Sequence, residues 1–122
     1  MKIKFQTENQ TFYGEFNNTQ TAKEITRHLP IESTISLWGD EIYFDLGFKA
    51  SAHNATMDVD IGDIAYWSQG KCLCVFFGPT PVSQNKKPVP ASPVVIIGKT
   101  NTAAQELKKI DLGEKIILTR EE

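Results

Sequence analysis

The sequence predicts a mainly β protein in which about eight short strands and two short helices close into a barrel or pack as two sheets. Three observations support this fold class. Apolar and polar residues alternate along most of the chain, turns containing glycine and proline separate these runs, and helical spacing of apolar residues occurs only twice. Closure is the economical arrangement because it removes the unpaired edges of a sheet.

The overall composition is that of an ordinary globular protein, with 122 residues, 40% of them hydrophobic, and a net charge of −2. A chain of this size can bury one core, so we expect a single domain over residues 1–122. Acidic and basic residues are interspersed, which argues against nucleic acid as a partner. No apolar run reaches the roughly 18 residues that cross a bilayer, and no signal peptide is recognisable. We therefore expect a cytoplasmic protein with no membrane partner.

Most of the strands are expected to pair as hairpins. Short turns join the alternating runs at 3–7 and 10–16, at 33–37 and 42–44, and at 61–67 and 71–77. In the third turn we expect Gly70 to supply a positive φ. Two further strands are expected at 94–97 and 115–119.

Both helices are predicted from cap signals followed by apolar residues at helical spacing. Thr21 and Glu24 have the spacing of a capping box, and Pro30 ends the first helix. Thr102 and Gln105 have the same spacing before the second. Each helix is expected to be short.

Two segments are expected to be loops. Residues 47–60 are irregular, with a short strand expected near Met57–Val59. Residues 79–93 contain every proline of the chain except Pro30, and proline removes donors from strand ladders. Loops of about 15 residues inside a compact domain are usually functional or disordered.

Metal and disulfide chemistry has little support in the sequence. Cys72 and Cys74 lie on one face of a strand, where a bridge would strain the backbone, so buried reduced thiols are expected. With only His28 and His53 in addition, the chain offers few ligands for zinc. We expect no metal and no cofactor.

The carboxylates have simple structural explanations. Asp58, Asp60 and Asp63 form a cluster that a hard cation would suit, but the spacing of an EF-hand is missing and turn capping is favoured. Asp40 and Glu41 are neighbours in a turn, and this alone does not indicate an acid–base pair.

Aromatic residues are concentrated in the middle third of the chain. In the pairs Tyr43-Phe44 and Phe76-Phe77, strand alternation sends one ring inward and one outward. The outward rings are explained either by a second packed face or by an apolar pocket whose Tyr and Trp side chains orient a ligand. Both explanations stay open.

Several motifs together resemble the small bacterial and archaeal cyclophilin-like proteins. They are Leu-Trp-Gly-Asp-Glu-Ile-Tyr-Phe at 37–44, Gly-Asp-Ile-Ala-Tyr-Trp at 62–67, Phe-Phe-Gly-Pro-Thr-Pro at 76–81 and Ile-Gly-Lys at 97–99. Their order and spacing match over nearly the whole chain. The resemblance implies a closed eight-stranded β-barrel with two helices that cover its ends.

The resemblance does not carry an activity with it. True prolyl isomerases of this fold present an arginine from a Phe-His-Arg motif beside an apolar proline pocket. This sequence lacks that motif, and neither Arg27 nor Arg120 matches its position. The matched aromatic and turn positions nevertheless define candidate ligand-binding residues, which are Tyr43, Tyr66, Trp67, Phe76, Phe77, Pro79 and Thr80.

The favoured hypothesis is a non-enzymatic or functionally unassigned cyclophilin-like barrel that binds a small apolar molecule or an extended peptide, including one that contains proline. A peptidyl-prolyl isomerase with a non-standard active site is the enzymatic alternative, with the missing arginine against it. A third hypothesis makes the aromatic face an oligomer interface, because contiguous apolar patches often mark contacts.

Overall fold

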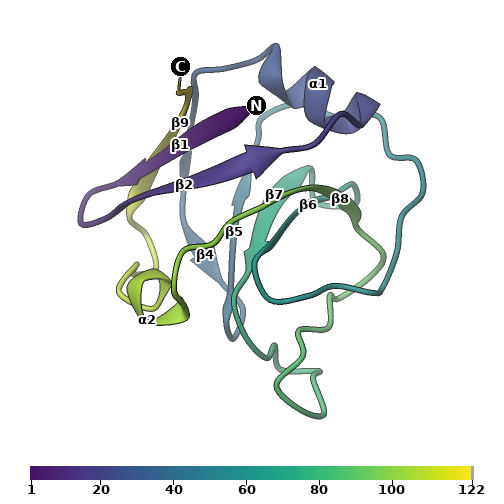
Figure 1. Cartoon of the computed structure of the whole chain (residues 1–122), viewed down its shortest axis with the longest axis vertical. Helices are drawn as coiled ribbons and strands as arrows, with labels where there is room; N and C mark the ends of the chain where they lie inside the picture. Colours follow the sequence, from purple (N-terminus) through teal and green to yellow (C-terminus); the bar gives the residue numbers. More distant parts are fainter. Residues whose placement is uncertain (122) are drawn as a thin grey trace.

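The computed structural model describes residues 1–121, which form one antiparallel sheet and two short helices (Figure 1). The elements are β1 (Lys2–Thr7), β2 (Thr11–Phe16), α1 (Gln20–Thr26), β3 (Ile31–Thr34), β4 (Ser36–Leu37), β5 (Glu41–Asp45), β6 (Asp63–Trp67), β7 (Cys72–Phe76), β8 (Val95–Lys99), α2 (Ala104–Leu107) and β9 (Lys115–Arg120). The three expected hairpins are confirmed as the pairs β1–β2, β4–β5 and β6–β7.

The sheet curves into a nearly closed barrel. Its strand order is β3-β9-β1-β2-β8-β6-β7-β5-β4. At the open seam β3 lies against β5, where the Ser33 hydroxyl donates a 2.7 Å hydrogen bond to the Asp45 carbonyl. The mainly β barrel expected from the sequence is thus confirmed.

The described residues form nine strands where eight were expected. The difference arises at Ile35, which separates β3 from β4. β3 pairs with β9, whereas β4 pairs with β5 on the other side of the seam. Between them Ile35 is buried, and its N–H donates to the Glu114 carbonyl. The chain turns from one edge of the sheet to the other here, so one expected strand becomes two.

The barrel interior is filled by large apolar side chains. Phe5 and Phe12 stack with ring centroids 4.6 Å apart. Both helices contribute to the same core, through Ile25 of α1 and Leu107 of α2, which are fully buried. The helices therefore close the barrel by burying one apolar side each.

The helix caps differ from the sequence prediction. α1 begins earlier than expected, because the Thr19 hydroxyl accepts the Ala22 N–H and forms the cap. Thr21 is instead buried in the first turn, where its hydroxyl donates to the Ser51 carbonyl. α2 has no side-chain cap, since its cap residue is Ala103. At Thr21, the tertiary contact with Ser51 outweighs the local capping-box signal.

Both expected loops are present. Residues 79–93 contain no helix or strand and extend away from the barrel between β7 and β8 (Figure 1). The short strand expected near Met57–Val59 is reduced to a single bridge between Thr56 and Val94. That bridge ties the two long loops together at the base of the second one.

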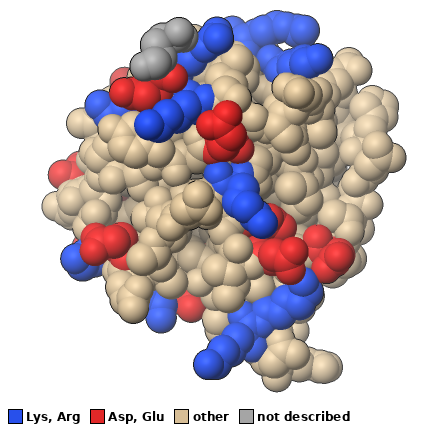
Figure 2. Space-filling model, viewed as in Figure 1, with Lys and Arg blue, Asp and Glu red and all other residues tan. Residues whose placement is uncertain are grey.

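The described surface has mixed charge. On the face shown in Figure 2, positive and negative side chains lie beside one another and leave broad uncharged areas between them. Neither of the described helices is long and apolar enough to cross a membrane.

Candidate functional site

Strands β5, β6 and β7 bury both of their faces. Ile42 and Phe44 point into the barrel, while Tyr43 points outward. A second apolar cluster lies on that outer face, built on Ala65, Cys74 and Phe76 and the residues packed against them. The alternation expected for Tyr43-Phe44 is therefore confirmed, and the same holds for Phe76 outside and Phe77 inside.

A small cavity of about 180 Å³ opens in this outer cluster. We call it the outer pocket. Strands β5, β6 and β7 form its floor, the turn before β5 forms one side, and the loop before β8 forms the other. The lining residues are Trp38, Glu41, Tyr43, Trp67, Cys74, Phe76, Pro90, Ala91 and Val94.

Three of the candidate residues from the sequence meet in the outer pocket, namely Tyr43, Trp67 and Phe76. Two others face the opposite way. Tyr66 and Phe77 lie in the barrel core with 0% and 5% of their surface exposed. The Tyr66 hydroxyl accepts a 2.9 Å hydrogen bond from the buried Ala50 N–H. These two rings act in packing.

The remaining two candidates shape the proline-rich loop without lining the pocket. The Pro79 carbonyl accepts the Asp40 N–H, and this contact joins the start of the loop to the turn before β5. Thr80 is buried, and its hydroxyl donates a 2.6 Å hydrogen bond to the Val89 carbonyl. This contact closes the loop on itself and positions the residues that follow Val89.

Glu41 is the main pocket-lining residue that the sequence analysis did not select. It lies at the start of β5 opposite Phe76, so strand alternation places it on the same face as Tyr43. Strand alternation could therefore have identified Glu41 from the sequence. Pro90, Ala91 and Val94 had no such signal, because they reach the pocket only through the path of a long loop.

The Glu41 carboxyl group has unusual electrostatics. The residue is only 6% exposed, and burial raises its pKa from 4.5 to about 7, although a hydrogen bond with the Cys74 thiol opposes this. Among the described residues that line the pocket, none is Lys, Arg or His. An acid without a cationic partner favours its neutral form when buried. Near neutral pH, Glu41 is therefore divided between its two protonation states.

Both cysteines are free and buried, as the sequence predicted. Burial raises the pKa of Cys72 to about 11. The pKa of Cys74 lies well above its usual value, first because of burial and then because Glu41 is close. Thiolates are the reactive form of cysteine, so at neutral pH Cys74 acts as a weak donor to Glu41 and not as a nucleophile.

Trp67 is held from two sides. Its indole N–H donates a 2.6 Å hydrogen bond to the Ser92 hydroxyl, which donates in turn to Gln69. On the other side Gly70 packs against the ring, where an added Cβ would lie 2.5 Å from a ring carbon. The positive φ expected at Gly70 occurs instead at Lys71, with φ of 55°. Glycine is needed here for space.

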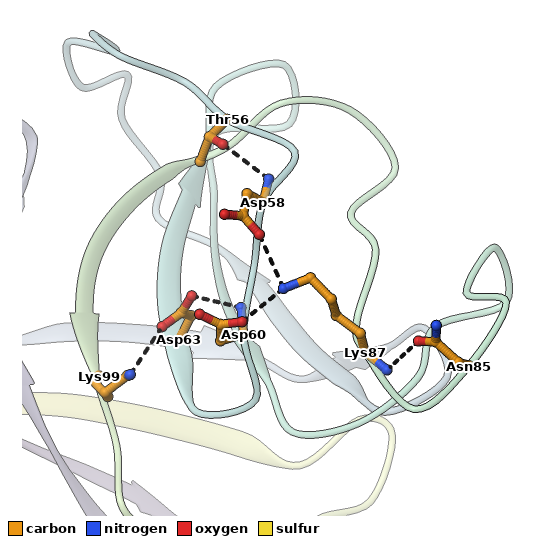
Figure 3. A network of polar contacts seen from close by, with 7 residues as sticks. All are labelled: Thr56, Asp58, Asp60, Asp63, Asn85, Lys87 and Lys99. Atoms are coloured by element: carbon orange, nitrogen blue, oxygen red, sulfur yellow. Dashed lines mark hydrogen bonds and ion pairs between the residues drawn. The ribbon is translucent and has the colours of Figure 1, made fainter.

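An ion-pair network fastens the proline-rich loop to the segment before β6 (Figure 3). The Lys87 ammonium lies 3.0 Å from Asp58 and 2.7 Å from Asp60, and the hydrogen bond with Lys87 lowers the pKa of Asp60. Together with the Thr56–Val94 bridge, these contacts fix the loop at its tip and at its base. The loop wall of the outer pocket is thus anchored at two points.

The acidic cluster is explained by these contacts and by turn capping. The Asp63 carboxylate accepts the Asp60 N–H at 2.8 Å, as expected for a capping residue, and lies 3.9 Å from the Lys99 ammonium. Within the described residues, no group of three potential ligands is arranged to hold a metal ion.

Comparisons with known proteins agree with the fold. The family model described as cyclophilin-like matches residues 1–119. Among solved structures, the chain is similar to the solution structure of a hypothetical protein from Archaeoglobus fulgidus, with 35% sequence identity and a TM-score of 0.84. The match covers 99% of this chain and 95% of the archaeal one. A comparison with curated proteins finds no match.

Proposed function

The chain belongs to the cyclophilin-like family, and we propose that it is a binding protein whose outer pocket takes one small, largely apolar group. The group is either a small molecule or one side chain of an extended peptide. The observation that carries the proposal is the outward set of aromatic rings around a cavity whose wall is anchored by hydrogen bonds and ion pairs.

The size of the pocket limits what it can hold. Drug-sized ligands occupy pockets of about 300–1,000 Å³, whereas an apolar cavity of about 150 Å³ accommodates benzene. The outer pocket, at about 180 Å³, belongs with the smaller class. A single ring, a branched alkyl group or a proline side chain fits this volume. A longer ligand would place only one such group inside and leave the rest on the surface.

The walls of the pocket supply both apolar surface and polar orientation. Trp38, Tyr43, Trp67 and Phe76 give large contact areas, and Glu41 offers one polar group at the floor. This combination of many apolar atoms with few polar ones is typical of small-ligand and peptide sites. Prolyl isomerisation would use the same pocket, but it needs a donor aimed at the X–Pro amide. The observations favour binding over catalysis.

The test is a titration of isotope-labelled protein with single-group probes, namely indole, cyclohexanol and a short alanine–proline peptide. We expect at least one probe to shift the indole N–H signals of Trp38 and Trp67. The cis–trans exchange rate of the peptide is recorded in the same samples. Binding without faster exchange supports the proposal, whereas faster exchange would replace it with an isomerase.

A blocked variant makes the test specific. Ala91 lines the pocket and is exposed at its rim, so Ala91→Trp fills the opening without disturbing the barrel core. Val82→Trp is the matched control, because Val82 lies in the same loop, is 53% exposed and does not line the pocket. We expect Ala91→Trp to abolish the shifts and Val82→Trp to keep them. The absence of shifts with every probe in the unmodified protein would overturn the proposal.

A further inference from the structure

The outer pocket combines two features that a purely apolar ligand does not require. Four of its lining residues are aromatic, and one is a buried acid. From this combination we infer that the preferred occupant is a methylated ammonium cation, carried by a small molecule or by a methylated lysine side chain. The inference rests on the proposed function and names the chemical class of the ligand.

The aromatic residues provide the first part of the recognition. Tyr43, Trp67 and Phe76 come from three adjacent strands and form the floor of the cavity, and Trp38 from the turn before β5 forms one side of it. The face of an aromatic ring carries negative potential, and tryptophan attracts cations most strongly. The indole of Trp67 is already fixed by Ser92 and Gly70, so little side-chain freedom is lost on binding.

Glu41 provides the second part. Its side chain is more than nine-tenths buried, lines the pocket, and has the Cys74 thiol as its hydrogen-bond partner. Buried acids are ordinarily paired with a cation or with several donors. A cation in the pocket would supply that missing partner. It would stabilise the carboxylate and would be attracted by the rings at the same time.

The neighbouring lysines are already engaged elsewhere. Lys87 pairs with Asp58 and Asp60, and the Lys108 ammonium lies 3.9 Å from Asp40, the residue before Glu41. None of the described lysines lines the outer pocket. A cationic partner for Glu41 would therefore have to come from outside the chain.

Methylation distinguishes this cation from an ordinary lysine side chain. A free ammonium is strongly hydrated and needs three hydrogen-bond acceptors to replace its water. The outer pocket offers one carboxyl group and otherwise mostly apolar walls. A methylated ammonium keeps the positive charge, needs fewer acceptors and buries its methyl groups against the rings. The pocket walls match that chemistry.

The proposed binding depends on pH through a limited set of groups. Glu41 is faced by Tyr43 of β5 and by Cys74 and Cys72 of β7, whereas the loop side contributes only uncharged residues. Asp40 in the preceding turn pairs with Lys108. Because the pKa of Glu41 is about 7, the carboxylate form that attracts a cation predominates only above this pH. The affinity for a methylated ammonium should therefore rise between pH 6 and 8.

The experiment compares two probes of equal shape, choline and its uncharged carbon analogue 3,3-dimethylbutan-1-ol. Each is titrated into the protein at pH 8 while the indole signals of Trp38 and Trp67 are followed. We expect choline to bind at least about tenfold more tightly, and we expect Glu41→Gln to reduce this preference by weakening choline more than the neutral analogue. A peptide that contains trimethyl-lysine is then compared with the same peptide carrying unmethylated lysine. Tighter binding of the methylated peptide indicates that the cation belongs to a protein, whereas binding of choline alone indicates a small molecule.

The outcomes separate the two proposals. Equal binding of choline and its neutral analogue would overturn the cation inference and leave the proposed function intact. If neither choline, nor its neutral analogue, nor any probe of the earlier test binds, both the cation inference and the proposed function are overturned. If Glu41→Gln does not fold, the carboxyl carbon signal of Glu41 is titrated with and without choline. A pKa lowered by choline supports the inference, and an unchanged pKa contradicts it.

Discussion

The inner and outer faces of β5, β6 and β7 are made from the same strands but differ in composition and use. The inner face carries Ile42, Phe44 and Tyr66, which are fully buried and fill the barrel. The outer face carries Tyr43 and Trp67, which are only partly buried, beside a buried acid and a cavity. Close packing stabilises the fold, so a face that leaves space and buries an acid supports the proposed binding function.

Under the proposed function, one strand serves two purposes. Each inward residue contributes packing that the outward residue beside it does not duplicate. Substitutions on the inner face should therefore change stability, while those on the outer face should change binding. The predictions below test this division, beginning with the largest expected effect.

The neighbours Phe44 and Tyr43 give the sharpest contrast. Phe44→Ala should lower the free energy of unfolding by about 3–5 kcal/mol, because it leaves a cavity in the core. Tyr43→Ala should cost only about 1 kcal/mol, since this side chain is only partly buried, but it should weaken probe binding. Urea denaturation and indole-shift titrations measure the two effects. Equal losses of stability in both variants would contradict the division.

The pH dependence of stability tests the buried acid. In the unfolded chain Glu41 releases its proton near pH 4.5, but in the folded protein it does so near pH 7. The folded state binds more protons between these values, so the free energy of unfolding should fall by about 3 kcal/mol as pH rises from 4.5 to above 7.

The control for this prediction is Glu41→Gln, in which the group no longer titrates. Unfolding curves of both proteins at pH 5 and pH 8 give the slope directly. In the variant, the free energy of unfolding should fall much less between pH 5 and pH 8. The variant should therefore be the more stable protein at pH 8. A decline of the same size in the variant would show that another group causes it.

Tyr66→Phe tests a polar contact on the inner face. The substitution removes the hydroxyl that accepts the buried Ala50 N–H and should cost about 1–3 kcal/mol of unfolding free energy. Probe binding should not change, because Tyr66 does not line the pocket. Weaker binding in this variant, measured by the same titration, would mean that the inner ring also supports the site.

Lys87→Met should have the smallest effect on stability. Lys87 and its two aspartates are solvent-exposed, and exposed ion pairs contribute little to folding. The loop should nevertheless become more mobile at its tip, and the probe should dissociate faster. Backbone relaxation of residues 82–88 and dissociation rates provide the readout. Unchanged loop dynamics would show that the base of the loop is sufficient to hold it.

The sequence predicts the barrel well but the pocket only in part. The directions of Tyr43 and Phe44 follow from strand alternation, which depends on local geometry alone. The candidate set nevertheless included Tyr66 and Phe77, because the family motifs record which residues occur and not which face they occupy. Applying the same alternation to β5 would have added Glu41. The split at Ile35 was not predictable, since it depends on a contact with Glu114, which lies just before β9 and is distant in sequence.

The loop wall lay beyond sequence reasoning for a different physical reason. Pro90, Ala91 and Val94 reach the pocket because contacts distant in sequence fix the loop, including the pair between Lys87 and Asp60 and the bridge between Thr56 and Val94. Such contacts leave no periodic pattern. Composition identified the loop as a segment of interest but gave no indication of where it folds back.

The most direct test of the division between the two faces is a side-chain NMR titration with choline at pH 8. The ring signals of Tyr43 and Phe76 and the indole signal of Trp67 report on the outer face, and those of Phe44 and Tyr66 report on the inner face. We predict saturable shifts that are large for the outer rings and small for the inner ones. Shifts of equal size on both faces, or none at all, would contradict the assignment of the outer pocket as the binding site.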